Sequence, residues 1–406
     1  MISVRIFGAL AVAAVIFVTT PIGAFAQAEQ TDLSKLRDVA AAGDAEAQFQ
    51  LGEIYLWGSG TPVDLEKAKT LLRTAANNDN LNAMRLLGEN LVGGWFLEQD
   101  VIGGQALLEY AVEAGDDKAM VALGKFFLYG EQLPKDEPRA RLLFEAAAEA
   151  GNGNGLQSFG ATLMWRGTDP ETAEAMLVQS GNMGVGAAWT SLAEGAMYGY
   201  LGQTQRRKFD GYAERALALG ETKIAVLEAQ RRLYGISMRA SGPLAVEGLE
   251  AAAREGNADA AAFLIQLVRD GNQLNVSSSP DLAETYLSEF SDTLSERVRD
   301  RLSFTIQASK AQKPRDFAEL AEVYDSRPEL KSVAHARDVL ATNENFAIYI
   351  LQRKLRQDGI YLGPLDGFAG RGTIRALWRA CNGLPDNSKC EDTVMHPSVI
   401  ARLIAE

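Results

Sequence analysis

The chain has 406 residues, and its 40 Lys and Arg residues against 53 Asp and Glu residues give a formal net charge of -13 at pH 7. This acidic balance argues against nucleic acid and against anionic membrane surfaces as partners. The length exceeds that of one ordinary globular domain, so more than one structural part is expected.

The first residues have the composition of a secretory signal peptide. Arg5 precedes an apolar run, Ile6 to Val18, and Ala24-Phe25-Ala26 provides small residues for cleavage before Gln27. The run is shorter than the ~20 residues of a membrane span. We therefore expect residues 1–26 to be removed between Ala26 and Gln27, leaving a periplasmic or otherwise exported protein with no membrane association. The alternative is an uncleaved N-terminal anchor.

A set of residues then recurs every 36 positions. The recurring positions are Ala47, Ala83 and Ala119; Leu51, Leu87 and Leu123; Gly52, Gly88 and Gly124; Gly58, Gly94 and Gly130; and Asp64, Asp100 and Asp136. A fixed period of about 20 to 50 residues is the signature of a solenoid, in which similar units stack on one another.

Each unit is predicted to be two helices joined by a glycine turn. Gly58 ends the first helix, and Asp64 is a good N-cap for a second helix over Leu65 to Asn77. Gly52 falls inside the first helix, where glycine costs roughly 1 kcal/mol relative to alanine. Its recurrence indicates that a neighbouring helix approaches closely at this position.

The unit also carries a family pattern. Its residues are Ala47, Leu51, Gly52, Tyr55, Gly58, Gly60, Asp64, Ala68, Ala75 and Ala76, with Asp79 in place of a closing glycine. In these residues the unit resembles the Sel-one-like repeat, a relative of the tetratricopeptide repeat. The resemblance implies a right-handed superhelix of helix pairs that binds other proteins.

The repeat pattern continues with drifting spacing as far as Arg297, which gives about seven units. We therefore predict an all-α protein with three parts after the signal peptide. A helix-turn-helix repeat solenoid occupies residues 27–300, a helical cap and linker occupies 301–342, and a small three-helix module occupies 343–406.

One aromatic series follows the repeats, at the end of each first helix and close to a glycine. It consists of Trp57, Tyr129, Trp165, Tyr198 and Tyr234. The series could form a ladder on which a ligand stacks, or each ring could pack on the loop of the next unit. Aromatic residues in phase with a repeat usually belong to the core, so we predict packing. Trp95 is out of phase, after Gly93 and Gly94, and is the better candidate for exposure.

The C-terminal region has a different pattern. Its residues are Leu351, Gln352, Leu355, Gly359, Tyr361, Gly363, Asp366, Gly367, Gly370, Thr373 and Ala376. Here the chain resembles the three-helix peptidoglycan-binding domain of cell-wall hydrolases. The resemblance implies a peptidoglycan-binding loop that contains Tyr361, Gly363, Asp366, Gly367, Gly370 and Thr373. Ala380 and Cys381 replace the aromatic-Gln pair of that family, and modules of this shape also dock proteins.

Cys381 and Cys390 are the only cysteines in the chain. In an exported protein two such cysteines are expected to form a disulfide, which would stabilise a small module. The alternatives are two free thiols or a metal site. His396 is nearby, but a fourth ligand for a metal is absent.

No catalytic motif is recognisable. The two histidines, His335 and His396, stand outside any arrangement of nucleophile and base, and no cofactor or metal is expected. We therefore predict a non-enzymatic periplasmic adaptor that binds a protein partner through the repeats and peptidoglycan through the C-terminal module. The alternative is a soluble regulator of envelope signalling or surface-polysaccharide export, and a weaker one is a cell-wall-remodelling enzyme.

The predicted partner face consists of polar positions between the core residues of the first helices. These positions are Gln48, Glu53, Arg85, Glu89 and Lys125. The alternative interpretation of the same residues is an ordinary solvated helix face.

Overall fold

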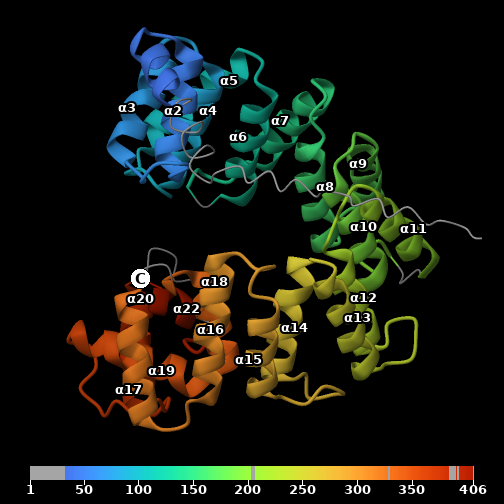
Figure 1. Cartoon of the computed structure of the whole chain (residues 1–406), viewed down its shortest axis with the longest axis vertical. Coiled ribbons are helices and arrows are strands. Elements are labelled where there is room, and N and C mark those ends of the chain that lie inside the picture. Colours follow the sequence, from blue (N-terminus) through green and yellow to red (C-terminus); the bar gives the residue numbers. More distant parts are fainter. Residues whose placement is uncertain are drawn as a thin grey trace, which may run out of the picture. The chain divides into compact units, whose positions relative to one another are not determined.

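The computed structural model of the chain describes residues 33–130, 132–202, 206–327, 330–383, 390 and 393–405 (Figure 1). The predicted signal peptide and its cleavage site lie outside the described residues. All regular structure within these ranges is helical. The chain divides into two compact units, one ending at Phe159 and the other beginning at Gly160.

Helices in the first unit pair in chain order, as the repeats predict. A helix over 33–41 comes first. The pairs are α2 (Ala45–Trp57) with α3 (Leu65–Asn77), α4 (Leu81–Gly93) with α5 (Val101–Glu113), and α6 (Asp117–Tyr129) with α7 (Glu137–Glu149). The division between the units falls inside α8 (Asn154–Arg166), which α9 (Pro170–Asn182) follows.

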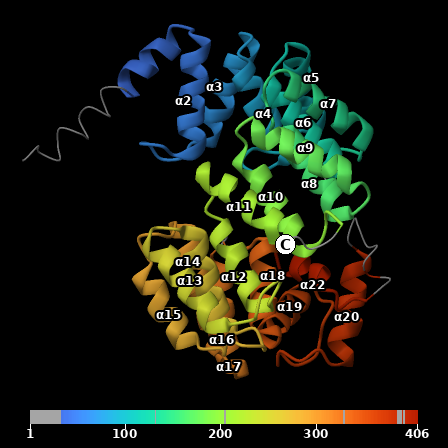
Figure 2. The ribbon, with the colours of Figure 1, turned by 90° about the vertical axis from the view of Figure 1, so that its right-hand side faces the viewer.

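The pairing continues in the second unit. The pairs are α10 (Gly186–Tyr198) with α11 (Arg206–Ala218), α12 (Ile224–Tyr234) with α13 (Gly242–Arg254), and α14 (Ala258–Asp270) with α15 (Pro280–Glu289). Together with α8 and α9, the helix pairs of the described residues account for the seven predicted repeats. Figure 2 shows helices α13, α14 and α15 side by side within this unit.

Recurring side chains set the ends of these helices. The N-caps of α3, α5 and α7 are Asp64, Asp100 and Asp136, whose carboxylates accept a hydrogen bond from the backbone N–H three residues later at 3.1, 2.9 and 3.0 Å. Gly58, Gly94 and Gly130 end α2, α4 and α6 in the left-handed conformation, with φ of 72°, 65° and 68°. Because glycine adopts this conformation freely, both predicted boundaries are confirmed.

In each early repeat, a glycine in the middle of the first helix leaves space for a large side chain of the second helix. A Cβ on Gly52 would lie 2.9 Å from Cγ of Leu72, and a Cβ on Gly88 would lie 2.9 Å from both Cγ of Leu108 and the carbonyl oxygen of Gly104. Leu72 and Leu108 are fully buried. The predicted close approach is confirmed, and the helix that approaches is the second helix of the same repeat.

The cap and the C-terminal module share one hydrophobic core. They consist of α16 (Glu296–Lys310), α17 (Pro314–Ser326), α18 (Val333–Thr342), α19 (Glu344–Gln357), α20 (Arg371–Asn382) and α22 (Pro397–Ala405). The Phe346 ring of α19 lies 6.0 Å from the Phe304 ring of α16 and 5.8 Å from the Phe317 ring of α17. Buried apolar residues continue from Phe304 to Ile404. Residues 343–406 therefore do not form a core of their own.

A buried group of charged residues connects the last repeat to the cap. Arg269 of α14 is 1% exposed, and its Nη2 donates to Asp270 at 2.6 Å and to Asp338 of α18 at 2.8 Å. His335 of α18 is also buried, with its Nδ1 3.4 Å from Nε of Arg301. Burial, reinforced by the positive charge of Arg301, lowers the pKa of His335 from 6.5 to about 4.

Replacement of Gly88 by alanine should destabilise the first unit. The added methyl group would meet the backbone oxygen of Gly104, which cannot move aside as a flexible side chain can. Overpacking of this kind costs about 1–3 kcal/mol, which exceeds the helical preference for alanine. Chemical denaturation would measure the change. The matched control is Gly248→Ala on α13, where nothing lies within 4 Å of the new methyl group, so stability should rise slightly. Equal effects of the two substitutions would contradict the close-packing argument.

Acidification should destabilise the second unit through His335. Its pKa is lower in the folded state than in the unfolded state, so the unfolded state binds more protons between pH 6.5 and about 4. The stabilisation is complete above pH 6.5 and is lost as the pH falls toward 4, by up to about 3 kcal/mol. Urea denaturation of His335→Gln should lack this part of the pH dependence. The control variant His396→Gln should retain it, and a wild-type slope in His335→Gln would refute the assignment.

Candidate functional site

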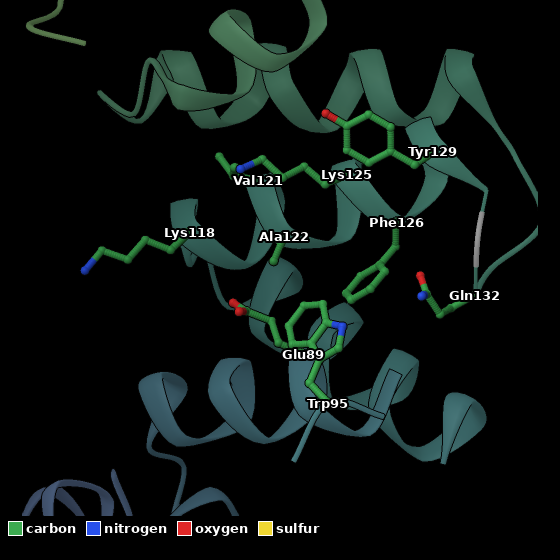
Figure 3. Close-up of a pocket in the computed structure, with 9 residues that line it drawn as sticks. All are labelled: Glu89, Trp95, Lys118, Val121, Ala122, Lys125, Phe126, Tyr129 and Gln132. Carbon is green, nitrogen blue, oxygen red and sulfur yellow. The ribbon is translucent and has the colours of Figure 1, made fainter. Parts of the chain in front are cut away.

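A groove lies on the first unit between α4 and α6, beside the loop that follows α4 (Figure 3). Its volume is about 360 Å³. Six of its lining residues belong to α6, from Lys118 to Tyr129, and the others are Glu89, Trp95 and Gln132. The groove therefore runs along the exposed face of a first helix, with Lys118 toward one end and Gln132 toward the other.

Two aromatic rings form the apolar part of this groove. The Trp95 ring stacks on the Phe126 ring with 6.1 Å between centroids and 24° between planes. Gly94 turns the chain at the end of α4, and the absence of a side chain on Gly93 leaves room for the indole. Phe126 is buried, but Trp95 remains 58% exposed, which confirms the prediction for this residue.

The rim of the groove carries positive charge. Glu89 is neutralised by Arg85, whose Nη1 lies 3.0 Å from Oε1 of the carboxylate. Lys118 and Lys125 are exposed, and neither makes an ion pair among the described residues. The carboxylate of Asp117, next to Lys118, accepts a hydrogen bond from Asn152 at 2.7 Å. Two available ammonium groups thus border an aromatic floor, in a chain whose net charge is -13.

The structure brings together only part of the predicted partner face. Glu89 and Lys125 line the groove, and Arg85 pairs with Glu89. Glu53 is half-buried on α2 and lies outside the groove. Gln48 does not belong on any exposed face, because its side chain is buried and donates to the carbonyl oxygen of Ala40 at 3.1 Å.

Sequence reasoning missed several residues of the groove, and a signal for them was present. Lys118, Val121 and Ala122, which were missed, lie at helical intervals on the same face of α6 as Lys125 and Tyr129, which had been named. Only the fold shows that this face remains uncovered.

The repeat-phased aromatic series was predicted to pack on the loops of the next units, as core residues, but the rings are only partly covered and do not belong to the core. The exposed fractions of Trp57, Tyr129, Trp165, Tyr198 and Tyr234 are 47, 55, 55, 37 and 53%. Each ring stands in the last turn of a first helix, before the chain turns away, so a neighbouring loop covers only part of it. For example, the Trp57 ring touches Phe96 of the next repeat edge-on, with 5.0 Å between centroids.

In the C-terminal module the predicted peptidoglycan-binding loop surrounds one buried glutamine. Gln352 Nε2 donates to Asp366 Oδ1 at 2.9 Å and to Thr373 Oγ1 at 3.0 Å, and its Oε1 accepts from the backbone N–H of Gly367 at 2.9 Å. The Tyr361 ring is buried, and its hydroxyl donates to the Pro364 carbonyl at 2.8 Å. These side chains hold the loop in shape, whereas Gly363 and Gly370 lie nearer its surface.

The surface of the module is instead formed by other residues. The large apolar side chains exposed there are Leu362, Phe368, Ile374 and Trp378, of which Leu362 is 91% exposed. Arg371, Arg375 and Arg379 lie along the exposed side of α20, beside Ile374 and Trp378. The module thus presents apolar and basic groups together.

The predicted disulfide between Cys381 and Cys390 is confirmed, with 6.0 Å between the two Cα atoms. It connects the end of α20 to the segment that leads toward α22. Across the described ranges, no three His, Cys, Asp or Glu side chains form a group that could hold a metal ion. In those same ranges no helix combines the length and apolar character needed to cross a membrane.

Comparison with protein families gives a match to the Sel1 repeat over residues 45–80 and 117–152. The chain contains Sel1 repeats. The two matched segments correspond to the pairs α2–α3 and α6–α7, and the α4–α5 pair between them has the same period. Most of the groove, from Lys118 to Gln132, therefore belongs to a Sel1 repeat.

Several solved structures are similar to the chain at low sequence identity. A Sel1 repeat protein from Oxalobacter formigenes is 22% identical, with 68% of this chain and 81% of that chain covered and a TM-score of 0.46. The protective antigen c5321 of uropathogenic Escherichia coli, which has an SLR fold, is 18% identical over 92% of this chain and 93% of its own, with a TM-score of 0.33. The immunity protein Pa5087 of Pseudomonas aeruginosa is 15% identical over 50% and 84%, with a TM-score of 0.35. Curated protein sequences gave no match.

Replacement of Gln352 by methionine should destabilise the C-terminal module. The side chain keeps a similar volume but loses its hydrogen bonds, so the buried N–H groups of Asp366 and Gly367 lose their acceptor. Each unsatisfied buried group costs about 1–3 kcal/mol. Thermal denaturation would detect the loss, and Gln357→Met at an exposed position of α19 is the control. Unchanged melting of Gln352→Met would show that the loop does not depend on this network.

Proposed function

We propose that the protein is a non-enzymatic periplasmic adaptor. Its Sel1 repeats bind a protein partner, and its C-terminal module tethers it to peptidoglycan. Sel1 repeats generally mediate protein–protein interaction. The observation that carries the proposal is the groove on the repeat face, which an exposed tryptophan and two exposed lysines line together.

The energetics of association support a docking role for this face. Tryptophan and tyrosine are enriched among the residues that dominate binding, since each buries a large area with few rotatable bonds. In the first unit Trp57, Trp95, Phe96 and Tyr129 are all at least 45% exposed. Burial of such rings against a partner is worth about 25 cal/mol per Å² of apolar surface.

Export of the protein and its attachment to the cell wall are inferred from the sequence alone. Residues 1–26 have the composition of a cleaved signal peptide, and residues 351–376 resemble a peptidoglycan-binding domain. A disulfide in the same module is in keeping with an oxidising compartment.

A second candidate is a soluble periplasmic regulator, of envelope signalling or surface-polysaccharide export, whose C-terminal module docks a protein. One observation favours it. Two loop residues expected to contact the wall, Asp366 and Thr373, instead accept hydrogen bonds from Gln352 inside the module. The apolar side chains of Leu362, Phe368 and Trp378 are exposed. Exposed apolar side chains next to arginines are typical of a protein-binding surface.

The decisive experiment uses the whole mature chain, residues 27–406, because the C-terminal module shares its core with the cap. The tagged protein is mixed with envelope proteins and with purified sacculi, and captured proteins and sedimentation are measured separately. The adaptor should capture a defined partner and also pellet with sacculi. Trp95→Ala should lower partner capture at least tenfold without affecting sedimentation, because Trp95 is in the groove.

The matched control is Trp378→Ala, which removes an exposed tryptophan from the C-terminal module and should leave capture by the repeats intact. Partner capture without sedimentation would refute the wall tether and leave the soluble regulator. A partner set unchanged by Trp95→Ala would refute docking at the groove.

A further inference from the structure

We propose that the groove between α4 and α6 binds an extended acidic segment of the partner protein, in which bulky apolar residues are flanked by carboxylates. The inference rests on the proposed function and specifies the chemistry that the groove recognises. Its two components are the aromatic floor and the pair of lysines on the rim.

The floor fits a large apolar side chain. Ala122 lines the groove with a single methyl group, so space remains beside the stacked rings of Trp95 and Phe126 (Figure 3). Phe126 and Val121 add to the apolar lining of the groove. An apolar side chain inserted there would shield the indole of Trp95, which is 58% exposed.

The rim selects for negative charge. Glu89 already has Arg85 at 3.0 Å, so its carboxylate is not free to attract a basic segment. Lys118 and Lys125 keep their charges at the surface, without an ion pair among the described residues. A basic ligand would meet like charges here, and a neutral ligand would leave both ammonium groups without a new partner.

The spacing of the two lysines sets the length of the segment. They stand seven residues apart on α6, which corresponds to roughly 10 Å along the helix axis. An extended chain in the polyproline II conformation has three residues per turn and rises about 3.1 Å per residue, so side chains three positions apart lie on the same side, about 9 Å from one another. Acidic residues three positions apart, with apolar residues between them, would bring one carboxylate to each ammonium group.

A fluorescein-labelled peptide, Gly-Ser-Glu-Leu-Phe-Glu-Ser-Gly, provides the test with the mature chain, and fluorescence anisotropy gives its Kd. Binding should weaken with added salt, and replacement of both glutamates of the peptide by glutamine should weaken it at least tenfold. Lys118→Glu combined with Lys125→Glu should do the same. Trp95→Ala should lower the affinity at least tenfold through the apolar component.

The control is Lys35→Glu combined with Arg73→Glu, which changes the charge of the first unit equally at exposed positions outside the groove. This double variant should bind the peptide like the wild type. Equal binding of the glutamine peptide, or an equal loss in the control variant, would overturn the proposal. A change of oligomeric state in the Lys118 and Lys125 variant would also overturn it, in favour of a second copy of this chain as the occupant.

The same variants separate this inference from the proposed function. If the captured partner is lost with Trp95→Ala but retained with the double lysine variant, the groove docks a protein and the acidic chemistry is wrong. If both variants lose the partner and the peptide, the inference is supported. If neither variant changes partner capture, the groove is not the docking site and both proposals fail.

Discussion

The close contact between a glycine of the first helix and a large side chain of the second is the constraint on which each early repeat depends. The side chain of Leu72 packs against Gly52, that of Leu108 against Gly88, and the ring of Phe144 against Gly124. The partners recur with the same 36-residue period as the glycines. Because no side chain separates the helices at this point, the two helices of a repeat can pack in only one register. This register sets how successive repeats stack on one another.

The groove arises where one repeat departs from this uniform scheme. After α4 the chain places Trp95 directly behind its capping glycine, at the position where Ser59 stands in the preceding repeat. The indole folds back over Gly93 and reaches Phe126 of the next first helix. A single bulky residue outside the repeat pattern therefore provides the aromatic wall of the groove, and the repeat pattern itself provides the face of α6 opposite it.

Much of the fold followed from local signals in the sequence. Caps such as Asp64 and Gly58, and the tight contact at Gly52, depend on residues near in sequence, and they were predictable. Gln48 and the aromatic series were misjudged because burial depends on what lies above a helix face, which a period does not show. The core that the cap and the C-terminal module share could not be predicted from the sequence either, because it brings together residues as far apart as Phe304 and Ile404, 100 positions along the chain.

The distribution of tryptophan has a spectroscopic consequence. Of the five tryptophans in the chain, Trp57, Trp95, Trp165 and Trp378 are between 47 and 58% exposed, and only Trp189 is buried, against Tyr212. Intrinsic emission of the native protein should thus be red-shifted and readily quenched by iodide or acrylamide. The native protein will therefore resemble a partly unfolded one by this criterion, while ligand-induced changes at its surface will be unusually visible.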